Sequence, residues 1–351
     1  MYYQNDDIRI DEIKELLPPI AILERFPATE NASATVFNAR NNIHQILTRK
    51  DDRLLVIIGP CSIHDPVAAL EYGQRLVALR EQYKGQLEIV MRVYFEKPRT
   101  TVGWKGLIND PYMDNSFQLN DGLRTARKLL VDLNEHGMPT AGEFLDMITP
   151  QYVADMMCWG AIGARTTESQ VHRELSSGLS CPVGFKNGTD GTIKVAIDAI
   201  GAANAPHHFL SVTKFGHSAI VSTKGNPDCH IILRGGREPN YSSEHVKDIS
   251  AQLVKSGLAD NIMIDFSHAN SSKDFKKQML VADDVAGQIS AGNRSIFGVM
   301  VESHLVEGRQ DLVEGVELCY GQSITDACIG WQDTETLLAT LNQSVIQRRN
   351  A

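Results

Sequence analysis

Short apolar runs alternate along this chain with longer stretches whose apolar residues recur at helical spacing. The runs are mainly apolar rather than strictly alternating, which is typical of parallel strands buried on both faces. They lie at residues 54–59, 89–94, 139–144, 161–166, 182–187, 230–235, 262–267 and 297–303. We therefore expect these eight runs to be the strands of one parallel sheet.

Amphipathic helical patterns separate the runs, as Leu70, Leu76 and Leu79 illustrate between the first two. Helices are predicted over residues 67–83, 121–136, 246–257, 275–289 and 334–345, another is predicted to begin at Asp190, and Gly137 fits a helix C-cap. Strand–helix alternation over about 250 residues predicts an α/β fold, a (β/α)8 TIM barrel. A doubly wound sheet is the alternative, but no Gly-x-Gly-x-x-Gly follows the first strand.

Two segments are additions to the predicted barrel of residues 53–351. Residues 1–52 form an N-terminal extension with a break at Pro18 and Pro19 and a helical pattern over about 31–47. A second apolar stretch, at about 207–221, lies between the fifth and sixth strands and predicts an inserted β-hairpin. Such additions serve assembly or regulation, or are mere decoration, and the sequence alone leaves these three readings open.

The composition of the 351 residues is that of an ordinary globular protein, with 42% hydrophobic and 22% charged residues. The net charge of −9 disfavours nucleic acid and anionic membranes as partners, and taken alone it also disfavours anionic ligands. The N-terminus has no signal-peptide pattern, and the apolar runs are far shorter than the roughly 18 residues of a membrane span. The six cysteines form no CxxC pair, which favours a cytoplasmic location.

Polar side chains mark the carboxyl ends of all the predicted strands, where (β/α)8 enzymes place their chemistry. In chain order they are Cys61, Arg92, Glu143, Arg165, Lys186, Arg234, Asp265 with His268, and Glu302. For any one of them, a strand-end side chain that turns to solvent is the alternative. Their presence on every strand predicts one polar site at this rim.

The basic members of this set predict an anion-binding site. Arg92, Arg165, Lys186 and Arg234 come from four strands, with Lys97, Arg99 and Lys105 in the loop after the second. Clustered cations repel one another in a low-dielectric cavity, so they suit an anion, and arginine matches carboxylate and phosphate oxygens. A small ligand with phosphate and carboxylate groups is expected. Surface salt bridges are the alternative.

A second group has the chemistry of a metal site. Cys61, His268, Glu302 and Asp326 offer a thiolate, an imidazole and two carboxylates, which together suit a first-row divalent metal. Only the barrel brings these four together, and the mixed donor set fits Mn²⁺, Fe²⁺ or Zn²⁺. An inert buried cysteine and a structural histidine are the alternative.

Several longer motifs carry a family resemblance. They are GPCSIHD from Gly59, MRVYFEKPRTTVGWKG from Met91, AGEFLD from Ala141, GARTTESQVHRELSSGLSCPVGFKNGTDG from Gly163, ILRGG from Ile232, DFSHANS from Asp265, VMVESHLVEG from Val299 and SITDACIGW from Ser323. By these motifs the chain resembles the 3-deoxy-D-arabino-heptulosonate 7-phosphate (DAHP) synthases. The resemblance covers essentially the whole chain and is strongest to the feedback-regulated, phenylalanine-sensitive type.

The resemblance implies a metal-dependent transferase that condenses phosphoenolpyruvate with erythrose 4-phosphate and water to give DAHP and phosphate, the first step of the shikimate pathway. The implied substrate-binding residues are Arg92, Lys97, Arg99, Thr100, Lys105, Glu143, Ala164, Arg165, Lys186 and Arg234. Among them, Arg99 is expected to hold the phosphate of erythrose 4-phosphate, and Glu143 to position a water. Lys97 or Lys186 is expected to donate a proton.

The resemblance also implies one divalent metal ion per subunit on Cys61, His268, Glu302 and Asp326, with Mn²⁺ or Fe²⁺ favoured over Zn²⁺ or Co²⁺. It implies feedback inhibition by an aromatic amino acid, expected to be phenylalanine. The implied inhibitor-binding residues are Asp6, Asp7, Met147, Pro150, Gln151, Ala154, Leu175, Leu179, Ser180, Phe209, Ser211 and Val221. The N-terminal segment of a neighbouring subunit completes this cavity, in a homo-oligomer expected to be a tetramer built as a dimer of dimers.

Three other functions compete with this interpretation. The related eight-carbon 3-deoxy-octulosonate 8-phosphate synthases use a five-carbon sugar phosphate, but the KPRT motif and the long N-terminus disfavour them. A metal-free aldolase would use Lys186 in a Schiff base. A non-catalytic amino-acid sensor would keep only the inhibitor cavity, which the complete metal-ligand set disfavours.

Overall fold

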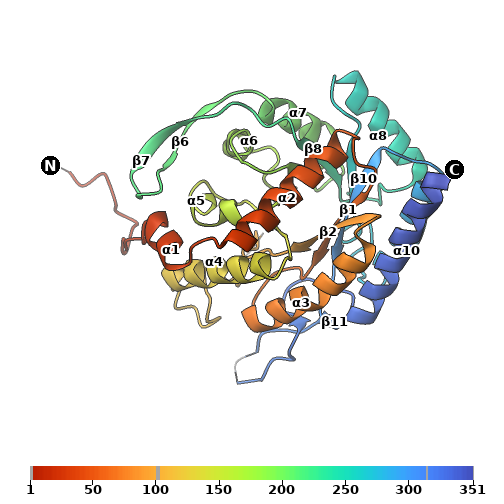
Figure 1. Ribbon diagram of the computed structural model, residues 1–351. Coiled ribbons are helices and arrows are strands. Elements are labelled where there is room, and N and C mark those ends of the chain that lie inside the picture. The colour runs from red at the N-terminus through yellow and green to blue at the C-terminus, as the bar shows by residue number, and fades with distance from the viewer. Residues whose placement is uncertain (1–2, 100–102, 314, 351) are drawn as a thin grey trace.

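A closed barrel of eight parallel strands forms the centre of the molecule (Figure 1). The computed structural model describes residues 3–99, 103–313 and 315–350. Around the barrel the strands follow the order β1 (Leu54–Gly59), β10 (Ile296–Glu302), β9 (Ile262–Asp265), β8 (Cys229–Leu233), β5 (Val183–Lys186), β4 (Trp159–Ile162), β3 (Thr140–Glu143) and β2 (Leu87–Arg92). The predicted (β/α)8 fold is confirmed.

Helices surround the barrel, and most of them return the chain to the start of the next barrel strand. They are α3 (Pro66–Tyr83), α4 (Leu119–Glu135), α6 (Gln170–Ser176), α7 (Lys194–Ala203), α8 (Ser243–Lys255), α9 (Lys277–Ser290) and α10 (Trp331–Asn350). Between β3 and β4 the connection is shorter, with α5 (Pro150–Val153) and the 3-10 turn η1 (Ala154–Met156). Gly137, with φ of +78°, follows the end of α4 as predicted, because glycine adopts this left-handed conformation without strain.

The predicted helix start at Asp190 is wrong. The Asp190 carboxylate accepts hydrogen bonds from the Thr192 amide at 2.9 Å and the Thr192 hydroxyl at 2.7 Å. Gly191 between them has φ of +101°, so the segment forms a tight turn. Local side-chain bonds of this kind compete with helix formation, and α7 begins only at Lys194.

The helix α2 (Glu30–Leu47) lies across the amino-terminal end of the barrel, after the short α1 (Pro19–Arg25). From α2, Asn42 donates to the Glu88 carboxylate on β2 at 3.0 Å, and the His44 ring lies 2.8 Å from the Asp228 carboxylate just before β8. The apolar residues of α2 belong to the same buried core as the strands. This helix therefore closes the bottom of the barrel. The division between residues 1–52 and 53–351 stays a prediction.

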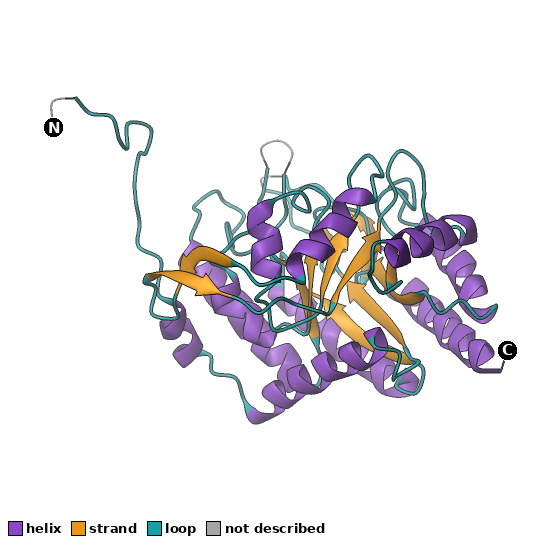
Figure 2. Cartoon of the chain, turned by 90° about the horizontal axis from the view of Figure 1, so that it is seen from above, coloured by secondary structure: helices purple, strands orange, loops and turns teal. Residues whose placement is uncertain are grey.

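The predicted hairpin is present as the antiparallel pair β6 (His208–Val212) and β7 (Ser218–Ser222). Near its tip the Lys214 carbonyl accepts a hydrogen bond from the Ile20 amide at 2.8 Å, which ties the hairpin to α1. The segment ahead of α1 extends away from the barrel (Figure 2). A small parallel pair, β11 (Val306–Arg309) and β12 (Gln322–Ser323), follows β10. Within the described residues, none of the helices has the length and apolar character needed to cross a bilayer.

Candidate active site

Close approaches at the carboxyl ends of the strands require glycine at two positions. A Cβ atom at Gly59, the last residue of β1, would lie 2.7 Å from the carbonyl oxygen of Arg92 on β2. A Cβ atom at Gly163, just after β4, would collide with a carboxylate oxygen of Glu143. These glycines therefore leave space at the rim for Arg92 and Glu143.

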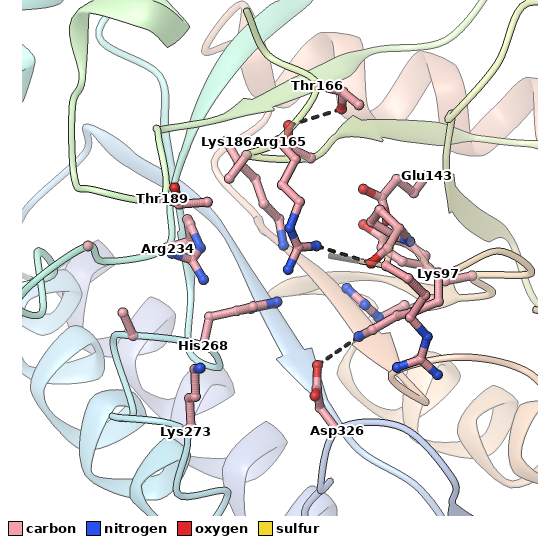
Figure 3. A pocket seen from close by; sticks show the side chains of 18 residues that line it. Lys97, Glu143, Arg165, Thr166, Lys186, Thr189, Arg234, His268, Lys273 and Asp326 are labelled. Atoms are coloured by element: carbon pink, nitrogen blue, oxygen red, sulfur yellow. Dashed lines mark hydrogen bonds and ion pairs between the residues drawn. The ribbon is translucent and has the colours of Figure 1, made fainter. Parts of the chain in front are cut away.

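A cavity of about 530 Å³ opens at this rim (Figure 3). The predicted site residues that line it are Arg92, Lys97, Arg99, Glu143, Ala164, Arg165, Lys186, Arg234, His268 and Asp326. They come from many strands, and in Figure 3 the side chains of Lys97, Arg165 and His268 point into the same space. Lys105 is exposed and is not among the described lining residues. Thr100 lies outside the described residues.

Several lysine and arginine side chains line this cavity. The Lys186 ammonium lies 2.8 Å from the buried Asp265 carboxylate, whereas Arg165 donates to the Pro98 carbonyl at 3.2 Å and Arg99 to the Trp104 carbonyl at 2.8 Å. Burial lowers the pKa of Arg234, and the nearby charge of Arg165 lowers it further against the opposite effect of Asp265. Carbonyl oxygens are neutral, so they leave the positive charge of these guanidinium groups uncompensated. The groups also repel one another, and a bound anion would relieve that repulsion.

Arg92 connects this cationic side to the candidate metal ligands. Its side chain is buried, and its guanidinium donates to the carbonyl oxygens of Pro60 and Cys61, both at 3.0 Å. It also lies 3.1 Å from the Glu302 carboxylate. The ring of Tyr94 covers the guanidinium at a distance of 3.5 Å from its centre. Arg92 is therefore held in one position by four neighbours.

Three of the predicted metal ligands form one cluster. Ligand atoms of Cys61, Glu302 and Asp326 all lie within 4.8 Å of one another. Cys61 and Glu302 are buried, and the Oε1 atom of Glu302 lies 3.1 Å from the Arg92 guanidinium but accepts no hydrogen bond among the described residues. A buried carboxylate oxygen of this kind keeps lone pairs for a further cation. The donor set fits a divalent metal.

The Lys97 ammonium contacts two members of this cluster. Its Nζ atom is 2.9 Å from the Cys61 sulfur and 2.7 Å from a carboxylate oxygen of Asp326. Burial raises the pKa of Asp326, but the charge and hydrogen bond of Lys97, followed by the effects of His268 and Cys61, together outweigh burial, so that the pKa lies well below its ordinary value. Burial and then Glu302 raise the pKa of the Cys61 thiol despite Lys97. Lys97 thus compensates the negative charge next to the substrate cavity.

His268 lines the cavity but does not join the cluster of three, since its ring nitrogens do not lie within 4.8 Å of all three ligand atoms. Its backbone has a φ of +58°, the left-handed conformation that a non-glycine residue adopts only under constraint. This conformation is at the turn just after β9, which directs the imidazole toward the cavity (Figure 3). The role of His268 as a ligand stays a prediction.

Some lining residues were absent from the sequence prediction. They are Tyr94, Gly163, Thr166, Thr189, Gly236, Ala269 and Lys273, together with Pro98, which occurred only within the KPRT motif. Most lie one to several residues beyond a strand end, in loops whose direction the apolar pattern does not indicate. Lys273 has φ of +61°, and that backbone turn brings a further cation to the rim. Its position five residues after His268 was the one available signal.

A second cavity, of about 330 Å³, lies beside the barrel between the hairpin and the α5–η1 connection. The predicted inhibitor residues that line it are Met147, Pro150, Gln151, Ala154, Leu175, Leu179, Ser180, Phe209, Ser211 and Val221. The structure adds Arg40, Asp155, Gly178 and Lys214 to this lining. Asp6 and Asp7 are exposed in the N-terminal segment, outside this lining, and their role stays a prediction.

The walls of this second cavity combine apolar and charged groups. Phe209 and Leu175 are nearly buried, and the Ser211 hydroxyl donates to the Met147 carbonyl at 2.8 Å, which ties the hairpin to the segment before α5. Burial lowers the pKa of Lys214, which donates to the Gln151 carbonyl. Apolar walls with charges of both signs suit a zwitterion with a large side chain.

The sequence profile of the DAHP synthetase I family matches residues 26–339. The chain belongs to this family. It is 74% identical over 349 residues to the phospho-2-dehydro-3-deoxyheptonate aldolase, Phe-sensitive, of Escherichia coli (strain K12), covering 99% of this chain and 100% of that protein. It is 69% identical to the phospho-2-dehydro-3-deoxyheptonate aldolase of Haemophilus influenzae, covering 99% and 96% of the two chains. The predicted family is confirmed.

More distant members of the family are similar over nearly the whole length of the chain, at lower sequence identity. The Trp-sensitive aldolase of Escherichia coli (strain K12) is 52% identical over 345 residues, 98% of this chain and 99% of that one. A solved structure of the Francisella tularensis SCHU S4 aldolase superposes with a TM-score of 0.95 at 52% identity, covering 97% and 99% of the two chains. The family is metal-dependent, in agreement with the cluster of Cys61, Glu302 and Asp326.

Proposed function

We propose that this protein condenses phosphoenolpyruvate with erythrose 4-phosphate and water to form DAHP and phosphate, as the first enzyme of aromatic amino-acid biosynthesis. The observation that carries the proposal is the juxtaposition of two groups in one cavity. Seven cationic side chains, Arg92, Lys97, Arg99, Arg165, Lys186, Arg234 and Lys273, line it together with Asp326. Beside them lies a thiol and carboxylate cluster suited to a metal. Two anionic substrates and a metal-assisted carbonyl reaction require this combination.

The cations bind and orient the substrates. Arg92, Lys97, Arg165, Lys186 and Arg234 hold the phosphate and carboxylate of phosphoenolpyruvate, and Arg99 holds the phosphate of erythrose 4-phosphate, with Thr100 and Lys105 as further candidates. Without these charges two anions would repel each other, so preorganised cations lower the cost of bringing C3 of phosphoenolpyruvate close to the aldehyde carbon. A metal ion on Cys61, His268, Glu302 and Asp326 would supply Lewis-acid polarisation of the aldehyde.

Carbon–carbon bond formation leaves positive charge at C2 of phosphoenolpyruvate. Glu143 faces the same cavity and orients the water that adds to this carbon. Phosphate then leaves by cleavage of its C–O bond. Lys97 or Lys186 donates the proton to the new hydroxyl, since both ammonium groups lie at the cavity wall. A Lys97→Met variant with wild-type turnover would exclude Lys97 as the donor.

One assay separates this proposal from its rivals. Purified protein is treated with EDTA, and activity is measured after adding back Mn²⁺, Fe²⁺, Zn²⁺ or Co²⁺. We expect loss of activity and rescue, best with Mn²⁺ or Fe²⁺. Consumption of arabinose 5-phosphate in place of erythrose 4-phosphate would identify the eight-carbon synthase. Activity that survives EDTA, with borohydride trapping of substrate on Lys186, would identify the Schiff-base aldolase.

The second cavity supports a proposal of feedback inhibition by phenylalanine. Its volume of about 330 Å³ and its mixed apolar and charged walls fit an aromatic amino acid. Asp6 and Asp7 of a neighbouring subunit complete the site in a tetramer built as a dimer of dimers, because the exposed N-terminal segment is free to reach another chain (Figure 2). Inhibition by phenylalanine, tyrosine and tryptophan at equal concentration tests the effector, and analytical ultracentrifugation tests the tetramer.

The chemistry of the same site supports a reducing, cytoplasmic location. All six cysteines are free thiols, and Cys61 would coordinate a metal only in its reduced form. Fractionation of cells that express the protein tests this location.

A further inference from the structure

Asp265 holds a central position below the active-site cavity without lining it. It is the last residue of β9, its side chain is fully buried, and it is absent from the lining of the cavity. Its Oδ2 atom lies 2.8 Å from the Lys186 ammonium and 2.9 Å from Nδ1 of His268. One carboxylate oxygen is therefore shared by a substrate-binding cation and a candidate metal ligand.

The neighbours of His268 determine which of its ring nitrogens carries hydrogen. The Ser267 hydroxyl donates its only hydrogen to Oδ1 of Asp265 at 2.6 Å, so its oxygen is an acceptor toward Nδ1 of His268, 2.7 Å away. Asp265 Oδ2 is an acceptor as well. Two acceptors around Nδ1 require that Nδ1 carries the hydrogen, which leaves the lone pair on Nε2. This is the nitrogen that faces away from Asp265 and is able to bind a metal.

Lys186 depends on the same carboxylate for its charge balance. Its side chain is 6% exposed, and Asp265 is the carboxylate that pairs with it among the described residues. A buried ammonium requires a counter-charge, because desolvation alone disfavours the charged form. When an anionic substrate binds Lys186, the substrate supplies part of the counter-charge that Lys186 needs. The Asp265 carboxylate then becomes a stronger acceptor for the His268 Nδ1–H group. A stronger acceptor makes the imidazole a better metal ligand.

We propose that Asp265 is a positioning residue that couples metal binding at His268 to phosphoenolpyruvate binding at Lys186. The inference deepens the proposed function and rests on it. Each ligand is expected to increase the affinity for the other, and linkage requires the two effects to be equal. Asp265 touches neither ligand and acts through the two side chains that it orients.

The test measures binding in the absence of turnover. Free Mn²⁺ is followed by electron paramagnetic resonance as apo protein is titrated, with and without phosphoenolpyruvate, for wild type and Asp265→Asn. The asparagine keeps the size of the side chain but loses the charge. We expect the variant to bind Mn²⁺ about 10- to 100-fold more weakly, as for other second partners of metal-binding histidines. We also expect the effect of phosphoenolpyruvate on Mn²⁺ affinity to be smaller than in wild type.

Asp260→Asn is the matched control. Asp260 lies before the start of β9, at the other end of the barrel, where it accepts hydrogen bonds from Ser295 and Ser250. The control is expected to keep wild-type Mn²⁺ affinity and coupling. Wild-type affinity and coupling in Asp265→Asn would overturn the proposal.

If Asp265→Asn does not fold, the wild-type titration still tests the coupling. Tighter Mn²⁺ binding in the presence of phosphoenolpyruvate supports the proposal, and a Mn²⁺ affinity that phosphoenolpyruvate leaves unchanged contradicts it. Because both measurements use binding alone, their failure is distinct from failure of the proposed function, which is decided by consumption of erythrose 4-phosphate.

Discussion

The guanidinium carbon of Arg92 lies 3.5 Å from the centre of the Tyr94 ring. The ring covers one face of a buried cation whose edge binds Pro60, Cys61 and Glu302. A cation stacked on an aromatic ring in a desolvated site gains about 2 kcal/mol. Among the described residues, by contrast, the Tyr94 hydroxyl has only a long contact of 4.0 Å with the Met300 sulfur.

Replacing the ring should therefore weaken substrate binding more than removing the hydroxyl. We expect Tyr94→Leu to raise the KM for phosphoenolpyruvate about tenfold or more, since 1.4 kcal/mol corresponds to a factor of ten. Tyr94→Phe should remain close to wild type. Steady-state kinetics of both variants decides the matter, and equal damage in the two would assign the effect to the hydroxyl.

Metal binding should release a proton and strengthen as pH rises. Burial and Glu302 raise the pKa of Cys61, so the thiol is protonated at neutral pH in the metal-free protein, yet the metal ligand is the thiolate. Below that pKa the affinity should increase by up to about tenfold per pH unit. Calorimetric titration with Mn²⁺ in two buffers of different ionisation enthalpy measures the released proton. Cys61→Ser should abolish this release, and binding without proton release in wild type would contradict the prediction.

The stability of the fold should fall as pH rises through the neutral range because of Glu96. Burial, then Asp146 and Glu143, raise the pKa of Glu96 from 4.5 to about 8. Between these values the folded protein keeps a proton that the unfolded chain has released, so the stability contributed by the neutral form is lost progressively from about pH 4.5 to about pH 8. Glu96→Gln, neutral at every pH, should match wild type in Tm near pH 5 and exceed it near pH 9. The exposed Glu24→Gln is the control, and parallel Tm curves for wild type and Glu96→Gln would refute the assignment.

Filling the second cavity should remove feedback inhibition without loss of catalysis. Ser211 lines this cavity from β6, and its hydroxyl binds the Met147 carbonyl. Ser211→Phe should reduce inhibition by phenylalanine at least tenfold while kcat stays near wild type, because a coupling of 1–3 kcal/mol is about 5- to 150-fold. Leu210→Phe is the control, since Leu210 precedes it on the same strand and is 78% exposed on the opposite face. Equal inhibition of both variants would show that the effector binds elsewhere.

The barrel was predictable because its strands are buried on both faces and read as continuous apolar runs. The strand-end rule then led from Arg92, Glu143 and Lys186 to the cavity without further information. Periodicity does not predict loop direction, so Lys105 was included with the cavity residues although it is exposed outside the described lining, and Lys273 was missed. The start of α7 was also missed, because the bonds of Asp190 to Thr192 outweigh helix propensity there.

In the candidate site, too, residue types were predictable from the sequence, whereas contacts between individual atoms were not. Cys61, Glu302 and Asp326 come from distant parts of the sequence, and only the closed barrel makes them neighbours. The shared use of Asp265 by Lys186 and His268 is a matter of distances between individual atoms. Residue identities indicate that a carboxylate is available, but only the folded geometry determines which groups it serves.

The helix α2 has a kinetic consequence. It spans the amino-terminal end of the barrel, so the catalytic cavity is approached from the opposite, carboxyl-terminal end. The proposed phosphoenolpyruvate residues Arg92 and Lys186 are buried, whereas Arg99, the proposed residue for erythrose 4-phosphate, is exposed. We therefore expect phosphoenolpyruvate to bind first and erythrose 4-phosphate to bind over it.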